Sequence, residues 1–593
     1  MVKDFPFLHV IMQEGGCIVI RFQNKEKVTR EMADIKRKTT VCSWVRLLLA
    51  VLVVFFAICF LSLELSLLYL ILSVFFLALF IAFTVLSNPF YHRLKILKNL
   101  ENVYLKHENR RNGHYQNFGD DGRDFILYDD YKILDLDLLG PRSLYQYLCS
   151  AKTKKGREQL AKQLTSPIEK EEEFRSCVSH MATDENLFRL ESTLLAMSKE
   201  LSTSDVDECL GQLDRRFSFG KKILIGVAIC YLLILAAAVF LWQMKWPFYY
   251  LILFFFLNFF LCRLLTKHPL FSINATKYAD LLAAYEQFAN DILATSFHHP
   301  YFEAKKAKIK RELPALIRIK KMMDMLSYRK NFILNFLGNG LFFMDVLIGM
   351  RYDREALKIT SVEESIQAMA EIEVMLSFAN IGFDNETYCS GKKSDRILID
   401  EGYHPLIKKC VPNSFSFSGG VVLTGSNMSG KTTFQRMLGI NQILWNAGCL
   451  VCAAHFEAPF LEVKTSLRAN DLLQEGISTF YAEIKRMKAI MDTAKKKIPS
   501  LVLVDEIFKG TNAKDRIASS FEIMKTLQKY PVFFIITTHD FELCSFPLIT
   551  NYHFDEKYEN DQIFFDYKIK KGKSTTTNAR YLLKMAGVLE NLE

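Results

Sequence analysis

The chain has 593 residues, of which 50% are hydrophobic and 13% aromatic, and its formal net charge is +10. At roughly 150 residues per domain this length suggests about four structural units, which excludes a single small module and, with this composition, a disordered chain. The 49 phenylalanines and the positive mean hydropathy are high for a soluble protein and direct attention to membrane spans. The 13 cysteines, an odd number without evenly spaced pairs, favour a reducing compartment.

Two long apolar regions predict helical hairpins that cross a membrane. Leu47–Leu86 is about twice the length of roughly 20 residues that spans a bilayer, and Glu64 with two serines interrupts it near the middle. Ile223–Trp242 and Phe248–Leu265 form a second pair of apolar segments, separated by a short break that contains a lysine and a proline. Neither region has the polar face of a helix in a soluble core. We therefore predict four transmembrane helices in two hairpins.

A further apolar stretch, Phe332–Met350, is interpreted differently. It contains Asn335, Asn339 and Asp345, and each such group costs roughly 2 kcal/mol or more at the middle of a bilayer. We therefore interpret this stretch as a packed core helix.

The basic residues that flank the two hairpins predict the topology. They are Lys36, Arg37, Lys38, Arg46, Arg93, Lys95, Lys98, Lys221, Lys222, Arg263 and Lys267. Because basic residues stay on the cytoplasmic side, both chain ends and all soluble parts are expected in the cytoplasm. Only the short tips near Glu64 and Lys245 would face outward. The sequence thus predicts a multi-pass protein of the cell membrane.

A phosphate-binding loop follows a short apolar strand at Val421–Thr424 and precedes a helical pattern at Thr433–Trp445. Glycines let the loop curl so that its backbone N–H groups face phosphates, and the positive end of the helix adds to this field. Lys431 would neutralise the terminal phosphates and the Thr432 hydroxyl would coordinate Mg²⁺. The predicted nucleotide-binding residues are Gly425, Ser426, Asn427, Met428, Ser429, Gly430, Lys431, Thr432 and Thr433.

Two later strands supply the other residues that a hydrolytic site needs. Leu501–Val504 ends in Asp505, which would hold Mg²⁺, and in Glu506, which would orient the attacking water. Val532–Thr537 is followed by Thr538 and then His539. If the three strands lie in one parallel sheet with aligned carboxyl ends, the imidazole lies near the terminal phosphate. Glu506 and His539 are therefore candidate catalytic residues.

Six ordered motifs in the segment from about 370 to 593 resemble the ATPase domain of the MutS family of DNA mismatch-repair proteins. They are His404-Pro405-Leu406, Val411-Pro412-Asn413, TGSNMSGKTT at 424–433, NDLLQEGISTFYAE at 470–483, LVLVDEIFKGTN at 501–512 and TTHDFEL at 537–543. The resemblance implies an α/β P-loop domain with a parallel sheet of the kind shared by ABC and MutS ATPases. It also implies ATP and Mg²⁺ as ligands.

The resemblance further implies that the chain acts as a homodimer. In the family a Ser-Thr-Phe element, here Ser478-Thr479-Phe480, enters the partner's site, so Ser478 is a third candidate catalytic residue. The sequence departs from the family pattern at several positions. Tyr403 replaces an arginine, serines at 426 and 429 replace a proline and a glycine, and Cys410 stands where an adenine-stacking aromatic residue is expected.

Residues 129 to about 203 also resemble MutS, at the start of its helical lever core, and the second hairpin stands where the family carries a DNA clamp. The mismatch-reading domain has no counterpart in this sequence. The predicted order is a cytoplasmic tail (1–42), transmembrane hairpin 1 (43–88), a linker (89–123), the first part of an all-α lever core (124–220), transmembrane hairpin 2 (221–266), the second part of the core (267–369) and the ATPase domain (370–593).

One group of cations and one cysteine pair have a structural and a functional interpretation. The cations are Lys305, Lys306, Lys308, Lys310, Arg311, Arg318, Lys320, Lys321, Arg329 and Lys330. They could contact DNA, but the solvated face of a lever helix near anionic lipid is the preferred interpretation. Cys449 and Cys452 form a C-x-x-C without a second ligand pair, which favours buried core residues over zinc ligands.

Together these patterns predict a membrane-embedded MutS-type ATPase that hydrolyses ATP in a dimer and couples closure to lever helices and transmembrane hairpins. Its partners would be a second copy, membrane lipid and an unidentified membrane or cytoplasmic partner. The competing function is a membrane-tethered, DNA-binding ATPase for DNA repair or processing. A transporter is less favoured, because the Leu-Ser-Gly-Gly signature of ABC transporters is missing and four tight helices leave little room for a pathway.

Overall fold

The computed structural model describes residues 17–574, apart from 63–66, 168, 199–200, 202–205, most of 214–248, 267–273, 357–360, 427, 468–478, 509–510 and 560–561. The chain divides into two compact units. The N-terminal unit comprises the residues up to 108 together with 186–199, and the main unit comprises 109–185 and 200–593.

The N-terminal unit is built on an antiparallel pair of long helices. Its elements are α1 (Cys17–Ser62), α2 (Leu67–Arg111), η3 (Glu185–Leu187) and α7 (Phe188–Ala196). The Tyr91 hydroxyl of α2 donates to the Thr39 carbonyl of α1 at 3.1 Å, and Phe56 stacks on Phe76 near the other end of the pair. The predicted hairpin at this place is therefore confirmed as a pair of helices.

Both helices of this pair are long and apolar enough to cross a membrane, and their apolar windows are only 6% buried. The second predicted hairpin is not matched in this way. Its first half lies almost entirely outside the described residues, and its second half is α11 (Tyr249–Leu265), a helix of 17 residues. Among the described residues, two helices could each cross a membrane by length and composition, or three if one bent helix pair counts as a single span. Four transmembrane helices are thus not shown.

Helices α1 and α2 continue well beyond the apolar run, which differs from the expected tail and linker. Residues 17–42 and 89–111 are helical. Ion pairs between the two polar extensions stabilise them, because Arg93 bonds to Glu31 and Lys25 to Glu108. The rest of the expected linker is packed as well. It forms η1 (Tyr115–Asn117) and η2 (Arg123–Phe125), each a single 3₁₀ turn.

The main unit contains a helical core centred on α16 (Glu363–Asp384), which is buried along nearly its whole length and packs against α5, α6 and α13. The other core elements are α3 (Tyr131–Asp135), α4 (Leu144–Leu148), α5 (Lys154–Thr165), α6 (Glu172–Met181), α9 (Val206–Leu213), α12 (Ala275–Ala294), α13 (Pro300–Ser327) and η5 (Tyr328–Lys330). The predicted domain boundary at 369/370 falls inside α16. Helix α16 packs with the core helices, so residues 370–384 contact the core.

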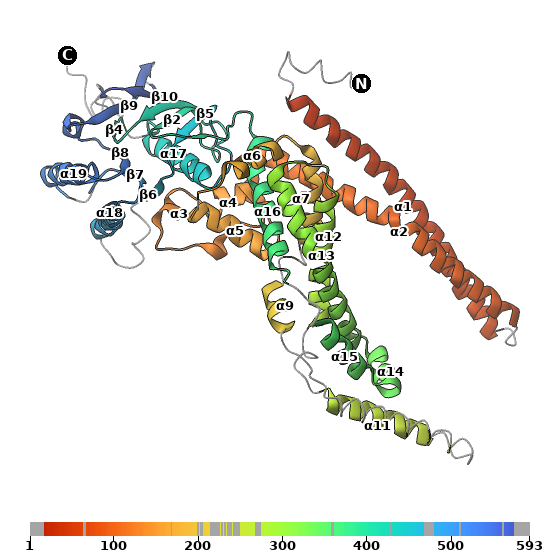
Figure 1. Ribbon diagram of the computed structural model, residues 1–593. Coiled ribbons are helices and arrows are strands. Elements are labelled where there is room, and N and C mark those ends of the chain that lie inside the picture. The colour runs from red at the N-terminus through yellow and green to blue at the C-terminus, as the bar shows by residue number, and fades with distance from the viewer. Residues whose placement is uncertain are drawn as a thin grey trace. The chain divides into compact units, whose positions relative to one another are not determined.

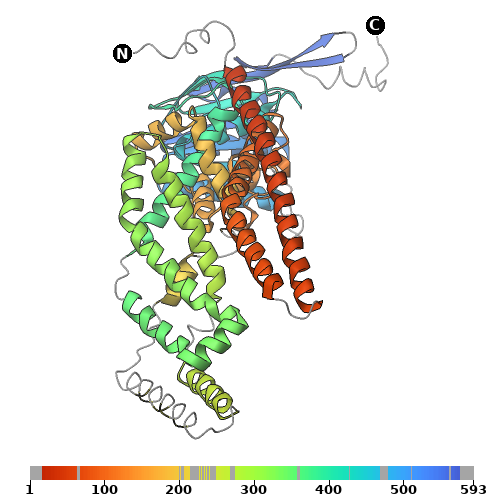
Figure 2. The same cartoon turned by 90° about the vertical axis from the view of Figure 1, so that its right-hand side faces the viewer.

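Helices α12 and α13 lie side by side in both ribbon views and lead from α16 toward two short apolar helices (Figure 1, Figure 2). These are α14 (Phe332–Phe342) and α15 (Met344–Ala356), which meet at a bend of 91°. The prediction of one packed core helix over Phe332–Met350 is therefore wrong. The chain turns at Phe343, whose backbone is in the left-handed region with φ 49°.

The part of the main unit from Lys392 onward contains the predicted nucleotide-binding loop and is called the nucleotide domain. It contains two sheets. A small sheet has the order β1-β5-β2-β3, and a larger one has the order β10-β9-β4-β8-β7-β6. The larger sheet is parallel except for its edge, where β10 runs antiparallel to β9. The strands are β1 (Lys392–Lys393), β2 (Ile397–Gly402), β3 (Asn413–Phe417), β4 (Gly420–Thr424), β5 (His455–Ala458), β6 (Glu462–Ser466), β7 (Ser500–Asp505), β8 (Val532–Thr537), β9 (Ile549–Glu559) and β10 (Gln562–Lys571).

Helices cover both faces of the larger sheet. They are α17 (Lys431–Asn446), α18 (Thr479–Lys495) and α19 (Ala513–Leu527), with η7 (Phe541–Ser545) as a short 3₁₀ turn. Alternate residues of β7 point to opposite faces, so Val502 and Val504 pack with α18 and α19 while Leu503 lies under α17. Buried strands with apolar residues on both faces are typical of a parallel sheet enclosed by helices.

Candidate nucleotide-binding site

The three strands that carry the predicted site residues end side by side. In the parallel register, Leu423 of β4 pairs with Thr537 of β8, and Thr537 pairs with Asp505 of β7. The strand bounds agree with the prediction to within one residue at each end. The carboxyl ends of parallel strands are where ligands bind in open α/β sheets. The expected alignment is therefore confirmed.

The loop between β4 and α17 has the backbone of a phosphate cradle. Gly430 precedes α17 with φ 102°, and Gly425 has φ 145°. A Cβ atom at Gly425 would approach the Phe554 carbonyl oxygen to 2.9 Å, so only glycine fits there without a shift. The Lys431 ammonium donates to the carbonyl oxygens of Gly425 at 2.8 Å and Ser426 at 2.7 Å. It is thus held inside the curl of the loop, beside the N-terminus of α17.

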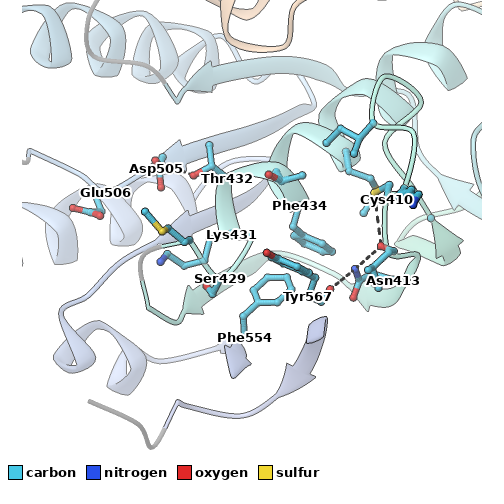
Figure 3. A pocket seen from close by; sticks show the side chains of 18 residues that line it. Cys410, Asn413, Ser429, Lys431, Thr432, Phe434, Asp505, Glu506, Phe554 and Tyr567 are labelled. Carbon is cyan, nitrogen blue, oxygen red and sulfur yellow. Dashed lines mark hydrogen bonds between the residues drawn. The ribbon is translucent and has the colours of Figure 1, made fainter. Parts of the chain in front are cut away.

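Three oxygen groups converge next to this loop. The Thr432 hydroxyl donates to Asp505 Oδ2 at 3.2 Å, and the Thr537 hydroxyl donates to Asp505 Oδ1 at 2.5 Å. Figure 3 shows Thr432, Lys431 and Asp505 on the same side of the pocket. Hydroxyl and carboxylate oxygens are ligands that Mg²⁺ prefers, and it completes its shell with water and phosphate oxygens.

Glu506 and His539 form a pair at the same edge of the sheet. The distance from His539 Nε2 to Glu506 Oε1 is 3.3 Å. Glu506 has a left-handed backbone, with φ 57°, and its N–H donates to the Thr537 carbonyl at 3.2 Å. This turn directs the side chain away from the strand and toward the pocket, which it lines. The structure therefore brings the two candidate catalytic residues together.

The base side of the pocket contains aromatic residues that the sequence reasoning missed. A cavity of about 490 Å³ extends from Asp505 and Lys431 past Phe434 and Tyr567 to Cys410 (Figure 3). The Tyr567 ring packs against the phosphate loop, because a Cβ at Gly430 would lie 3.2 Å from its Cδ1 atom. The sequence signal that could have identified Tyr567 is the alternating apolar pattern of β10. An aromatic wall is thus present although Cys410 is not aromatic.

Asn413, from the Val-Pro-Asn motif, fixes the position of Tyr567. Its Nδ2 donates to the Tyr567 carbonyl at 2.9 Å, and its Oδ1 accepts from the Ile569 N–H at 2.8 Å. These bonds span the irregular register in β10, where Tyr567 has φ 51°. The motif therefore joins β3 to the bulge that presents the ring.

His404, from the His-Pro-Leu motif, is a buried neutral imidazole beneath the pocket wall. It is 2% exposed, and its Nδ1 accepts from the Leu406 N–H at 3.3 Å. The backbone N–H of His404 donates to the sulfur of Cys410 at 3.3 Å. Burial lowers the pKa of His404 to about 4. The histidine thus orders the loop that carries Cys410 rather than facing a phosphate.

The first helix of the core is tied to the nucleotide domain at two points. Asp135 of α3 accepts from Arg486 of α18 through both carboxylate oxygens at 3.0 Å, and also from the Leu467 N–H at 3.0 Å. Asp135 is fully buried and Arg486 is 3% exposed. At the second point, Arg436 of α17 bonds to Asp137, two residues after the end of α3. A helix on each face of the sheet is therefore linked to the segment Tyr131–Asp137.

Two predicted site residues, Asn427 and Ser478, lie outside the described residues. The hydroxyls of two other predicted site residues, Ser426 and Ser429, have different surroundings. Ser426 Oγ bonds to Glu556 of β9, and Ser429 Oγ is buried without a hydrogen-bond partner among the described residues. A buried hydroxyl normally has a hydrogen-bond partner. A phosphate oxygen bound in the loop could accept a hydrogen bond from the Ser429 hydroxyl.

The donor set fits ATP with Mg²⁺, whereas other metal sites are not found. In the part of the chain that the structure describes, no group of three or more His, Cys, Asp and Glu residues could hold a metal ion. The magnesium interpretation therefore depends on Thr432 and Asp505 acting together with phosphate oxygens. Cys449 and Cys452 are buried free thiols whose pKa values burial raises, which agrees with a core position.

Comparison with known proteins identifies proteins that are similar to the C-terminal part of the chain. Residues 421–592 match MutS domain V. This C-terminal part of the chain is therefore similar to the MutS family. The DNA mismatch repair protein MutS of Natronomonas pharaonis is 30% identical over 243 residues, which are 39% of this chain and 28% of that protein. MutS of Thermus thermophilus is 28% identical over 251 residues, which are 41% of this chain and 30% of that protein.

A eukaryotic member of the MutS family is similar over the same extent. MutS protein homolog 4 of Mus musculus is 29% identical over 234 residues, which are 36% of this chain and 24% of that protein. The chain therefore matches less than a third of the length of each of these relatives. The match to MutS domain V lies in the nucleotide domain, and the apolar N-terminal helices are outside that match.

Proposed function

We propose that this MutS-family chain is a membrane-bound ATPase that hydrolyses ATP as a homodimer and transmits nucleotide-driven closure through its helical core to its membrane helices. The observation that carries the proposal is the convergence of Lys431, Thr432, Asp505, Glu506 and His539 at one edge of the sheet. A phosphate cradle with a water-orienting carboxylate nearby is the arrangement that P-loop hydrolases use.

Different residues of the chain would have different roles in ATP hydrolysis. Lys431 and the loop N–H groups would bind the phosphates, and Thr432 with Asp505 would hold Mg²⁺, which neutralises phosphate charge when bound. Glu506 would orient water, and the His539 imidazole, 3.3 Å from that carboxylate, would keep it in position. Tyr567 and Phe434 would stack against the base from the other end of the cavity.

A homodimer is supported by the family's use of a Ser-Thr-Phe element in the partner's site. The test mixes a Ser478→Ala chain with a Lys431→Ala chain and measures ATP hydrolysis. Each variant alone should be inactive, and mixed dimers should recover part of the activity, because one of their composite sites has an intact loop and an intact serine. Failure to recover activity in mixed dimers that have been shown to form would contradict hydrolysis by a composite site.

The membrane location is supported by α1 and α2, whose apolar side chains face outward along the run of the first hairpin. The proposed topology puts Asn112 in the cytoplasm and the tips near Ser62 and Gln243 outside. A membrane-impermeant cysteine reagent on intact cells should therefore label cysteines introduced at Ser62 or Gln243 and miss one at Asn112. Labelling of Asn112 would contradict the topology.

Transmission through the core is supported by a continuous series of contacts in the main unit. Asp135 of α3 bonds to α18, and Asp137, two residues after that helix, bonds to α17. Gly439 of α17 lets Leu136 pack closely against α17. The core helices α5, α16 and α13 follow in contact with one another, and α13 reaches α15. Rigid elements packed in series can carry a displacement from the site to distant helices.

The second candidate is a membrane-tethered DNA-binding ATPase, as the names of the mismatch-repair relatives suggest. The ten cations that could contact DNA weigh against it, because six of them form ion pairs within the chain: Lys305, Lys306, Lys308, Arg311, Lys320 and Arg329. Retention of the solubilised protein on immobilised duplex DNA decides between the two. Retention that falls steeply with salt would favour DNA binding, and no retention at low salt would exclude it.

A further inference from the structure

The far end of the α12–α13 pair carries a small group of apolar helices, which we call the tip. It consists of α11, α14 and α15, with α11 packed against α14 and α14 joined to α15 at the 91° bend (Figure 1). The approach of α11 to α14 is close, since a Cβ at Gly340 would lie 2.2 Å from the Phe255 ring. The three helices therefore form one packed element rather than separate segments.

The outer surface of the tip is apolar. Phe332 is 76% exposed, and large apolar side chains from all three helices are exposed with it. These side chains are Ile252, Phe256, Leu257, Phe260, Leu264, Ile333, Leu334, Leu337, Leu341, Phe342, Met344 and Leu347. Soluble proteins rarely expose apolar side chains in such a contiguous group without a partner.

The inside of the tip is polar. Asp345 is fully buried, and its carboxylate accepts from the guanidinium of Arg329, from the Tyr328 hydroxyl and from the Thr266 hydroxyl. Asn339 is also fully buried, and its Oδ1 accepts from the Asp345 N–H at 2.8 Å. Polar groups from three parts of the chain thus satisfy one another at the centre of the element.

A second polar contact lies between α11 and α14. Asn258 is 3% exposed, and its Nδ2 donates to the carbonyl of Gly340 at 3.2 Å. Cys262, one helical turn further along α11, places its thiol 3.3 Å from Asn339 Oδ1. The polar residues of α11 therefore face the same centre, while its phenylalanines at 256 and 260 face outward.

This distribution is the reverse of that in a water-soluble domain. In water, exposed apolar side chains and a buried ion pair are both unfavourable. In hydrocarbon, a charged residue exposed to lipid is strongly unfavourable, so such residues pair inside the protein and apolar residues face the lipid. Asp345 and Asn339, whose polarity is unfavourable in a bilayer, are thus shielded from the surroundings of the tip.

The lengths and charges of α14 and α15 indicate how the tip sits in a bilayer. At about 1.5 Å per residue, the 11 residues of α14 reach roughly 16 Å, about half of a hydrocarbon core of about 30 Å. Exposed basic residues stand at both outer ends of the bent pair, with Lys330 before α14 and Arg351 and Arg354 in the last turns of α15. Basic residues at both ends place both on the cytoplasmic side.

We propose that the tip is a re-entrant membrane element, with lipid acyl chains covering its outer surface and the Asp345–Arg329 pair holding its bend. The pair α14–α15 enters the bilayer from the cytoplasmic side, turns at Phe343 and returns to the same side. The inference rests on the membrane location proposed above and adds to it a site of lipid contact at the end of the lever helices. A movement of α13 would therefore act directly on the bilayer.

The test uses the full chain in nanodiscs of phosphatidylcholine and phosphatidylglycerol, with a benzophenone amino acid placed at single positions. The position tested is Phe332. Phe75 of α2, which is 56% exposed, reports on the membrane location itself, and Leu548 of the nucleotide domain, which is 91% exposed, is the control in water. After irradiation, intact mass identifies lipid adducts and gel mobility identifies crosslinked dimers.

The proposal predicts lipid adducts at Phe332 and Phe75 and none at Leu548. Adducts at Phe75 without adducts at Phe332 would overturn the tip and leave the membrane location standing. A protein–protein crosslink at Phe332 in place of lipid would identify a second copy of the chain as the occupant and would also overturn the proposal. Absence of adducts at both Phe332 and Phe75 would overturn the proposed membrane location together with the tip.

Discussion

The nucleotide domain and the tip bury opposite kinds of side chain. In the domain, Val502, Phe534 and Ile536 fill the core, and the polar residues stand at the strand ends where a ligand can reach them. In the tip, Asp345 and Asn339 fill the centre and phenylalanines cover the outside. Each arrangement minimises the free energy in its own surroundings, water for the domain and hydrocarbon for the tip.

Two Arg–Asp pairs with a fully buried carboxylate differ in what they connect. Asp135–Arg486 joins the core to the helix that follows the Ser-Thr-Phe element, so it lies between two parts that would move during a nucleotide cycle. Asp345–Arg329 lies within one element and holds its bend. The first pair is therefore expected to affect coupling as well as stability, and the second to affect the fold of the tip.

The largest expected effect separates binding from hydrolysis in the nucleotide domain. Lys431→Ala should abolish ATP binding, because it removes the charge that neutralises the phosphates in the ground state. Glu506→Gln should bind ATP normally and hydrolyse it at least about 100-fold more slowly, because it removes only the water-orienting carboxylate. Equilibrium binding of a fluorescent ATP analogue and phosphate release measure the two effects. Equal loss of binding in both variants would contradict the assigned roles.

The next effect sharpens the comparison of the two buried pairs. Asp135→Asn and Asp345→Asn each leave an arginine without its charge partner, and each should destabilise the protein by about 3–5 kcal/mol. Adding Arg329→Gln to Asp345→Asn restores a neutral, hydrogen-bonded pair and should recover most of the loss. Thermal unfolding in nanodiscs measures all three variants. An Asp345→Asn protein as stable as the parent would show that the carboxylate is not buried in an apolar medium.

His404 gives the nucleotide domain a pH dependence in a defined window. Its pKa is about 4 in the folded protein and about 6.5 in the unfolded chain, so the unfolded state takes up the proton first as the pH falls. Protonation of His404 in the unfolded chain lowers the free energy of unfolding. This loss is nearly absent above pH 6.5 and reaches about 3 kcal/mol by pH 4. His404→Asn keeps an acceptor near the Leu406 N–H and should flatten this slope. An unchanged slope in denaturant unfolding between pH 4.5 and 6.5 would contradict a buried neutral imidazole.

The smallest effect concerns the base side of the pocket. Tyr567→Ala should weaken ATP binding about 3- to 10-fold, which corresponds to the roughly 0.5–1.5 kcal/mol of an aromatic contact. Tyr567→Phe keeps the ring and should bind ATP like the parent. Isothermal titration on the Glu506→Gln background measures both. If alanine and phenylalanine weaken binding equally, the ring does not contact the base.

Much of the nucleotide site could be predicted from the sequence because its residues are local to strand ends. The loop from Gly425 to Thr432, the acid pair after Leu501–Val504 and His539 after Thr537 are each set by a short segment, and the sheet brings them together. Tyr567 could not be placed in this way. Its position depends on the antiparallel edge strand and on Asn413, which lies more than 150 residues away in the chain.

The bend of the tip could not be predicted from the sequence for a related reason. The cost of Asn339 and Asp345 in a bilayer was judged for each residue alone, within the run Phe332–Met350. Their partners lie before and outside that run, at Arg329 and Thr266, and pairing depends on the bend at Phe343. A sequence pattern gives the polarity of a residue but not whether a distant residue satisfies it.

Coupling between the nucleotide site and the tip is tested most directly by a distance measurement between the two protomers of the dimer. A spin label attached through a non-natural amino acid at Phe332 reports the separation of the two tips in nanodiscs. On the Glu506→Gln background, ATP should shift this distance distribution, and Lys431→Ala should show no shift because it binds no nucleotide. An unchanged distribution in Glu506→Gln protein that has bound ATP would contradict transmission from the site to the membrane.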